Sequence, residues 1–243
     1  MAALFYGDHG HRDPALTLVR DLGQSPGATR LVVAALLFLP LSCLSPPMNV
    51  FASESVCEVD QDSSLVQIRV YKEGRLSVFG DNHIISTSDL SGDLKLDRQS
   101  IEQSKISIEI PTRSLVVNDP RLRAAAEPEF NSRVSAFNQR ITRKSMLGSR
   151  VLDAEKYPKI AITVEKIPQN LDGIGELEVE LRGTKQKEQA RMAVNLTGNR
   201  FTATGRVLLS QKRYGIRPFS ILFGGIRVRN VLRLDFEITA NCQ

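Results

Sequence analysis

The residue types that most often carry chemistry are few and unevenly placed in this chain of 243 residues. It contains three His, three Cys and no Trp. After residue 52 only His83, Cys57 and Cys242 remain of these. A zinc site needs several such ligands that converge, and a hydrolytic triad needs a His beside its nucleophile. Residues 53–243 therefore exclude a multi-His zinc site or a four-Cys cluster.

His83 is the single candidate for acid–base or metal chemistry in this region. Asp81 and Asn82 precede it and could orient its imidazole, and such a histidine can titrate near neutral pH or ligate a metal or haem. One His and one nearby carboxylate are too few ligands for a stable zinc site, so we predict no metal site. The alternative role is structural, with both ring nitrogens bonded to backbone groups of a turn. Residues 53–243 contain no Gly-x-Ser-x-Gly motif, and we predict no catalytic residue and no enzyme activity.

An apolar run at residues 31–44 is typical of a secretory signal peptide. It has 14 residues, fewer than the ~18–20 that a membrane-spanning helix needs. Arg30 precedes it, and Val50-Phe51-Ala52 offers residues of the kind that a signal peptidase recognises. We expect residues 1–52 to be a leader, residues 53–243 to be one exported domain, and the protein to be periplasmic or extracellular. The alternative is a retained run that anchors the chain in a membrane.

Polar and apolar residues alternate through most of residues 53–243, which is the pattern of half-buried β-strands. In residues 227–240, for example, Val228, Leu232 and Leu234 fall on one face and Arg229 and Arg233 on the other. Gly-containing turns separate the alternating segments, as expected for successive antiparallel strands. The predicted strands are 65–71, 83–88, 93–97, 105–110, 159–166, 175–181, 189–196, 200–209 and 227–240.

Residues 121–150 break this alternation and predict one helix. From Phe130 to Met146 the apolar residues recur near helical spacing, with Pro128 at the start and Gly148 at the end. One helix beside about eight strands predicts an all-β domain with a flanking helix.

The two cysteines distinguish between the ways in which about eight antiparallel strands can be arranged, as a sandwich or as a closed barrel. Cys57 lies a few residues before the first predicted strand, and Cys242 lies two residues after the last. Closure of a barrel brings those strands together, and cysteines so placed form a disulfide in an oxidising compartment. We predict a Cys57–Cys242 disulfide; the alternative is two free thiols.

Three segments resemble motifs of the YceI-like family, in the order in which that family has them. They are Val151-Leu-Asp-Ala-Glu-Lys-Tyr-Pro-Lys-Ile160, Leu181-Arg-Gly-Thr-Lys185 and Arg213-Tyr-Gly-Ile216. Gly80-Asp-Asn-His-Ile84 and Val117-Asn-Asp-Pro120 resemble a subgroup that has a Gly-x-Asn-His segment. The resemblance covers about residues 65–240. The chain lacks the extended Leu-Thr-Ile lead-in that many relatives have before the Gly-Thr-Lys turn.

The resemblance implies an eight-stranded antiparallel, lipocalin-like barrel that holds a long apolar ligand such as a polyisoprenoid or an isoprenoid quinone. A barrel of eight strands is wide enough for one slender ligand, and the inward faces of the predicted strands are apolar. The candidate cavity residues are Ile106, Ile108, Ile162, Leu177, Val179, Met192, Val194, Phe201, Val207, Leu232, Leu234 and Phe236. The alternative for each of them is an ordinary packed core.

Basic residues beside the predicted helix could contact a lipid head group or an anionic membrane surface. The head-group candidates are Arg143 and Arg213, and their alternative role is to form a solvated basic face. The net charge of +5 is modest and both signs are mixed along the strands, so we predict no nucleic-acid partner. An aromatic content of 6% argues against a stacking platform for sugars or nucleobases.

These observations together predict an exported lipid-binding protein that needs no cofactor. Two other hypotheses stand beside it. The first is an interaction module whose barrel is solidly packed, and the second is a metal- or haem-linked redox partner that acts through His83.

Overall fold

The structure is a computed structural model that describes residues 54–168 and 172–243. The predicted leader lies outside these residues. The strands are β1 Glu54–Val59, β2 Leu65–Val70, β3 Lys72–Glu73, β4 His83–Thr87, β5 Ser91–Asp97, β6 Lys105–Pro111, β7 Val116–Val117, β8 Lys159–Lys166, β9 Gly173–Leu181, β10 Thr184–Thr197, β11 Arg200–Ser210, β12 Ser220–Ile221, β13 Ile226–Val228 and β14 Val231–Cys242. The α-helices in this part of the chain are α1 Pro120–Ala124 and α2 Ala136–Leu147.

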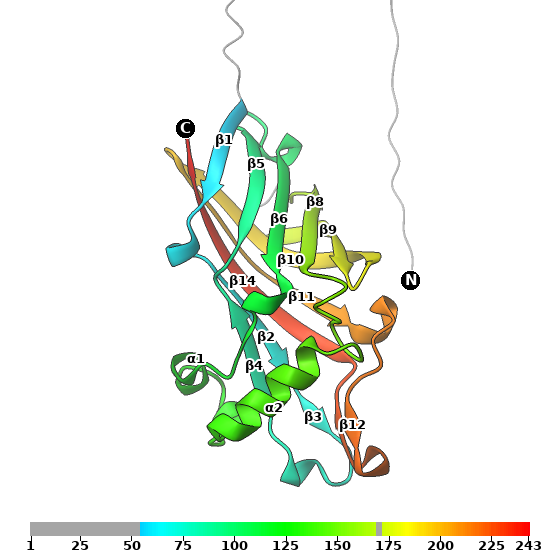
Figure 1. Cartoon of the computed structure of the whole chain (residues 1–243). Helices are drawn as coiled ribbons and strands as arrows, with labels where there is room; N and C mark the ends of the chain where they lie inside the picture. Colours follow the sequence, from blue (N-terminus) through cyan, green and yellow to red (C-terminus); the bar gives the residue numbers. More distant parts are fainter. Residues whose placement is uncertain (1–53, 169–171) are drawn as a thin grey trace, which may run out of the picture. The chain divides into compact units, whose positions relative to one another are not determined.

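Eight antiparallel strands close into a barrel in the order β1-β5-β6-β8-β9-β10-β11-β14, because β1 pairs with β14 (Figure 1). This confirms the predicted fold class. Strand β14 pairs with β11 along one edge, and it is long enough to pair with two strands, β1 and β2, along its other edge. Its C-terminal end pairs with β1, and its residues Arg233 to Glu237 pair with β2. Beyond β2, the sheet continues through β4 and β7.

The alternation of side chains along β14 directs its apolar residues into the barrel. Leu234 lies in register with Val207 of β11, and Phe236 lies in register with Gly205. A Cβ atom on Gly205 would lie 2.5 Å from Cζ of Phe236. Glycine at this position therefore leaves the space that the Phe236 ring occupies inside the barrel.

The disulfide pairs Cys57 with Cys242, which face each other in the β1–β14 register. Both cysteines lie within strands, whereas the sequence analysis placed them outside the first and last strands. Strand β1 was missed because its alternation is inverted: Ser55 is buried, while Val56 is 63% exposed. A hydrophobic pattern cannot identify a strand that buries a serine and exposes a valine.

The predicted strand 227–240 is wrong in one respect, because the structure divides it at residues 229 and 230. The backbone N–H of Arg229 donates to the carbonyl of Tyr71 across 2.8 Å. Asn230 uses its side chain to accept from the backbone N–H of Lys212 and to donate to Ser210. These bonds turn the chain, so that β13 pairs with β12 and β3 in a separate three-stranded sheet.

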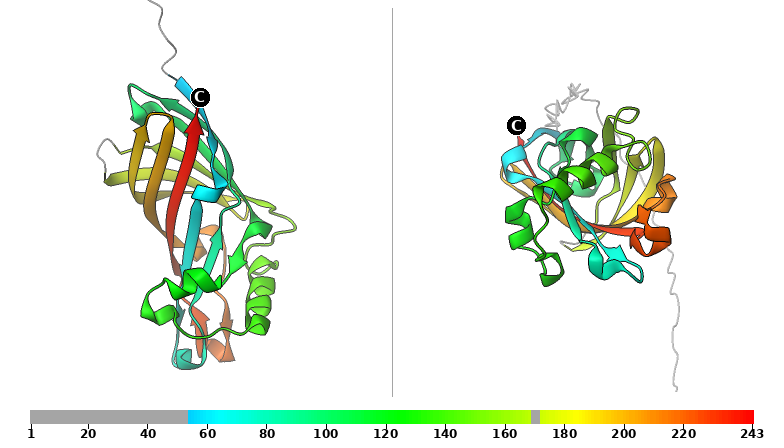
Figure 2. Two further views of the ribbon diagram at one scale, coloured as in Figure 1. Left: turned by 90° about the vertical axis from the view of Figure 1, so that its left-hand side faces the viewer. Right: turned by 60° about the horizontal axis from the view of Figure 1, so that its bottom comes forward.

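Helix α2 begins six residues later than the predicted start at Phe130. The Ser135 side chain caps it by accepting from the N–H of Asn138. Phe130 and Val134 are buried in the preceding segment, and their spacing made the helical pattern seem longer than the helix is. Arg143 of α2 donates to the carbonyls of Arg113 and Leu115, and these bonds hold the helix beside β7. Figure 2 shows α2 toward the end of the domain that lies opposite the C-terminus. Among the described helices, none combines the length and apolar character that crossing a membrane requires.

Candidate functional site

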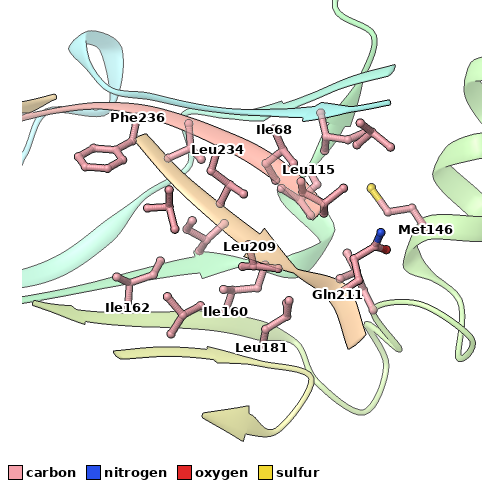
Figure 3. A pocket seen from close by; sticks show the side chains of 18 of the residues that line it. Ile68, Leu115, Met146, Ile160, Ile162, Leu181, Leu209, Gln211, Leu234 and Phe236 are labelled. Atoms are coloured by element: carbon pink, nitrogen blue, oxygen red, sulfur yellow. The ribbon is translucent and has the colours of Figure 1, made fainter. Parts of the chain in front are cut away.

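An apolar cavity of about 340 Å³ lies inside the barrel and continues to α2. Figure 3 shows Ile162, Leu209, Leu234 and Phe236 pointing into it from the strands, with Met146 of α2 at one end. The volume is more than twice the ~150 Å³ of an apolar protein cavity that stays dry and takes up benzene. The cavity is therefore large enough for a ligand.

Eleven of the twelve candidate cavity residues from the sequence line this cavity. Val194 is the exception, because it packs against the core without lining the cavity. The eleven are Ile106, Ile108, Ile162, Leu177, Val179, Met192, Phe201, Val207, Leu232, Leu234 and Phe236. The period-2 pattern thus correctly assigned nearly all the inward residues that it named, although these are fewer than half of the strand residues in the wall.

The sequence analysis did not name several further lining residues. Val66 and Ile68 of β2 follow the same alternation and could have been found by extending it. Leu115, Met146 and Ile216 lie in a turn, a helix and a loop. They reach the cavity only because the fold brings those segments to its end, and no local pattern predicts that.

Polar side chains in the wall are limited to His83, Thr142, Ser145 and Gln211, and no charged side chain of the described residues lines the cavity. His83 begins β4 and lies opposite Val70 of β2. Thr142 and Ser145 belong to α2. Because these residues lie at the α2 end, the polarity of the wall is confined to that end.

Hydrogen bonds fix the tautomer of His83. The Oδ1 atom of Asn118 accepts from the N–H of Ile84 across 3.0 Å and from Nη1 of Arg123 across 2.9 Å. The amide nitrogen of Asn118 must therefore face His83, whose Nδ1 lies 2.9 Å away and accepts. In the neutral ring the proton is then on Nε2. Burial lowers the pKa of His83 and outweighs the nearby Asp81 carboxylate, which raises it; the net shift favours this neutral form.

Gln211 is the second polar group at this end. Its Nε2 donates to the carbonyl of Arg229 across 2.8 Å, which leaves Oε1 as an acceptor. Figure 3 shows its amide beside Met146, at the end of the cavity that α2 borders. Nε2 of His83 has no hydrogen-bond partner within residues 54–168 and 172–243. At this end of the wall His83 thus presents an uncommitted donor and Gln211 an uncommitted acceptor, in addition to the hydroxyls of Thr142 and Ser145.

The two motifs of the subgroup resemblance meet behind His83. Arg123 is buried and donates to the carbonyl of Asn82, to Asn118 and to Ser132. The Asn82 side chain accepts from the N–H of Lys72 and donates to the carbonyl of Glu129. These bonds attach the segment before α2 to β4. The motif residues therefore support the cavity end, and of these residues only His83 lines the cavity.

Arg143 and Arg213, the predicted head-group contacts, do not line the cavity. Arg143 donates to the two carbonyls that position α2. Arg213 pairs with the buried Glu188 across 2.6 Å, and Tyr214 donates to the same carboxylate across 2.8 Å. Burial, together with this bond to Glu188, raises the pKa of Tyr214. Both guanidinium groups thus have structural partners.

No cluster of three or more His, Cys, Asp or Glu side chains suited to a metal ion occurs in the described part of the chain. His83 has an amide partner on Nδ1 and no carboxylate bonded to it. The alternative role for His83, with both ring nitrogens bonded to backbone groups, also differs from the structure, because the partner of Nδ1 is the side chain of Asn118.

Comparisons with known proteins agree with this architecture. A family model described as the YceI-like domain matches residues 58–240. Burkholderia cenocepacia BcnA has a similar structure, with a TM-score of 0.53 and 12% identity over 74% of this chain and 98% of that one. A polyisoprenoid-binding domain from Saccharophagus degradans, implicated in plant cell wall breakdown, has a TM-score of 0.50 and 11% identity over 77% of this chain and 98% of its own. No curated protein matches the chain.

Proposed function

We propose that this chain, which belongs to the YceI-like family, binds a long apolar lipid inside its barrel. The observation that carries the proposal is the wall of the cavity, which is apolar except at the α2 end. Burial of each ligand methylene in such a site stabilises the complex by about 0.8 kcal/mol. A lipid chain therefore needs no polar contact to bind.

A slender isoprenoid, either a polyisoprenoid or an isoprenoid quinone, is the ligand class that we propose. The interior of an eight-stranded barrel is just wide enough for one small or slender molecule. The similarity of fold to a polyisoprenoid-binding domain supports this choice. The cavity also disfavours the hypothesis of a solidly packed interaction module.

The polar end of the ligand, in this proposal, lies at His83 and Gln211. The N–H at Nε2 of His83 would donate to a quinone carbonyl or to an isoprenoid hydroxyl, and Oε1 of Gln211 would accept from the hydroxyl. This assignment replaces Arg143 and Arg213 as the head-group contacts, because their guanidinium groups have protein partners. The proposed role is binding and carriage rather than catalysis.

Export is also part of the proposal. It is supported by the apolar run at residues 31–44 and by the presence of a disulfide, which persists in oxidising compartments. We propose a periplasmic or extracellular location.

A cavity-filling variant with a matched control tests lipid binding. Ile162 points into the cavity, and its neighbour Thr163 is exposed on the outer face. Organic extracts of the purified wild type should contain an isoprenoid lipid, and the protein should take up an added isoprenoid quinone. Ile162→Trp should lose most of this uptake and Thr163→Trp should keep it. Absence of any bound or added lipid in the wild type would contradict the proposal, and so would haem or metal uptake that His83→Ala abolishes.

A further inference from the structure

Two neighbouring turns outside the barrel present large apolar side chains to solvent. The first is the 3₁₀ turn Ser77–Phe79, where Val78 is 76% and Phe79 is 78% exposed. The second is the 3₁₀ turn Leu222–Gly224, where Leu222 is 59% and Phe223 is fully exposed. Single exposed apolar residues are common on protein surfaces, whereas groups of large ones mark contact sites.

The two turns form one surface, which we call the apolar tip (residues 76–79 and 221–223). The N–H of Leu76 donates to the carbonyl of Gly225 across 2.8 Å. A Cβ atom on Gly225 would lie 2.8 Å from Cδ1 of Leu76, so the turns are in close contact. Figure 1 shows them side by side beyond β3 and β12, at the end of the domain opposite the C-terminus of β14.

The backbone of the second turn holds its side chains outward in a conformation that is unfavourable for them. Leu222 has a φ of 51° and Phe223 a φ of 52°. Two consecutive residues in the left-handed region are disfavoured because each Cβ approaches the following carbonyl oxygen. Such conformations persist where the surrounding structure imposes them, and they concentrate at functional sites. Here the result is an outward-pointing phenylalanine, which does not contribute to the core.

The two segments that carry the tip are rich in basic residues. Residues 72–80 and 217–229 contain five basic side chains, of which only Arg227 is paired with an acid, Glu73. The acid is 2.7 Å from Arg227 and is the only one in these two segments. The basic residues are Lys72, Arg75, Arg217, Arg227 and Arg229. An apolar projection on segments rich in basic residues is complementary to an anionic bilayer, which has negative head groups above an apolar interior.

The tip is continuous with the wall of the cavity. Phe219 lines the cavity and comes three residues before Leu222, and Val228 lines it from β13. The N–H of Val228 donates to the carbonyl of Phe219 across 2.9 Å. The same short segment therefore forms both the cavity wall and the tip.

We propose that the apolar tip inserts into the head-group region of an anionic bilayer and so brings the α2 end of the cavity to the membrane. This inference rests on the proposed lipid-binding function, since it supplies the surface from which a lipid would enter. A projecting tip on basic segments fits a bilayer better than it fits a protein groove, because a bilayer accepts apolar side chains without a matching shape.

The absence of Trp from the chain allows a direct test with the full-length protein. In Phe223→Trp, anionic vesicles of equimolar phosphatidylcholine and phosphatidylglycerol should shift the indole emission to shorter wavelength, and brominated phospholipid should quench it. The control is Leu208→Trp, on the outer face of β11, where Leu208 is 61% exposed. Its emission should not change. Unshifted and unquenched emission from Phe223→Trp, or equal changes in both variants, would overturn the proposal.

A second variant measures the contribution of the tip to vesicle binding. In this variant Val78→Ser and Leu222→Ser are added to Phe223→Trp, so that the indole still reports binding. Its emission should change only at vesicle concentrations that are higher, by about tenfold or more, than those that Phe223→Trp alone requires. High salt should also weaken the binding of Phe223→Trp to anionic vesicles, because salt screens the attraction between the basic residues and the lipid head groups. If the tip instead mediates self-association, sedimentation will show a dimer that the double variant abolishes, and the proposal fails.

The two proposals fail in distinguishable ways. Uptake of an isoprenoid quinone from detergent solution depends on the cavity alone, so the tip variants should retain it. Vesicle insertion without any quinone uptake would overturn the lipid-binding function and leave the membrane contact standing. Quinone uptake without insertion would overturn the membrane contact alone.

Discussion

Nδ1 of His83 accepts a hydrogen bond from the side-chain amide of Asn118 across 2.9 Å, although the residues are 35 positions apart in the chain. The amide oxygen of Asn118 accepts two hydrogen bonds, one from the backbone N–H of Ile84 and one from the guanidinium of Arg123. The contact therefore determines which ring nitrogen of His83 carries the proton. It also links the two motifs that flank the α2 end of the cavity.

Protonation of His83 should destabilise the fold, because an N–H at Nδ1 would face the N–H of Asn118. Burial lowers the pKa of His83 in the folded chain below its ordinary value of 6.5, so the unfolded chain binds the proton first as the pH falls. The contribution of His83 to stability is therefore complete above about pH 6.5 and is lost progressively below it. Urea unfolding between about pH 7.5 and pH 5.5 should show a smaller loss of free energy of unfolding in His83→Gln than in the wild type. Equal losses in the two proteins would contradict this account of the contact.

Removal of the Arg123 side chain should destabilise the domain by about 2–4 kcal/mol, because it leaves the carbonyl of the buried Asn82 without a donor and removes one of the two donors to the amide oxygen of Asn118. Arg123 is 8% exposed, whereas Arg121 of the same helix is exposed and makes no comparable side-chain bonds. Thermal unfolding of Arg123→Ala and Arg121→Ala measures the difference. A loss in Arg123→Ala no larger than in Arg121→Ala would show that the buried network contributes little.

The Cys57–Cys242 disulfide should contribute about 2–5 kcal/mol, since it joins residues that are 185 positions apart and restricts the unfolded chain. Cys57→Ser/Cys242→Ser should unfold at a lower urea concentration than the wild type under non-reducing conditions. Under reducing conditions the two should unfold together. Thiol titration of the unreduced domain that detects both cysteines would show that the bond does not form.

Most strands of the barrel, and the part of the cavity wall that they supply, could be predicted because period-2 alternation determines both at once. A strand that alternates, such as 105–110 or 175–181, also identifies the side chains that point inward. The pattern failed at β1, where Ser55 points inward and Val56 points outward. It also failed at residues 229 and 230, where long-range bonds to Tyr71 and Lys212 turn the chain.

The polar end of the cavity was less predictable because it depends on contacts between residues that are distant in the sequence. His83 could be singled out by its rarity, yet its partner Asn118 is distant in sequence and its tautomer depends on Arg123. Gln211 carries no local signal that it lines a cavity. Arg143 and Arg213 seemed available for a head group because their partners, two backbone carbonyls and the buried Glu188, become visible only in the fold.

The central claim is that the barrel interior holds a lipid, and a matched pair on β11 tests it most directly. Leu209 points into the cavity (Figure 3). The adjacent Leu208 is 61% exposed on the outer face. Native mass spectrometry with an added isoprenoid quinone should detect a one-to-one complex with the wild type and with Leu208→Arg. Leu209→Arg should form none while circular dichroism shows that it is folded, because the quinone would have to share an apolar cavity with an unpaired charge. No complex with the wild type, or equal uptake by a folded Leu209→Arg, would contradict the claim.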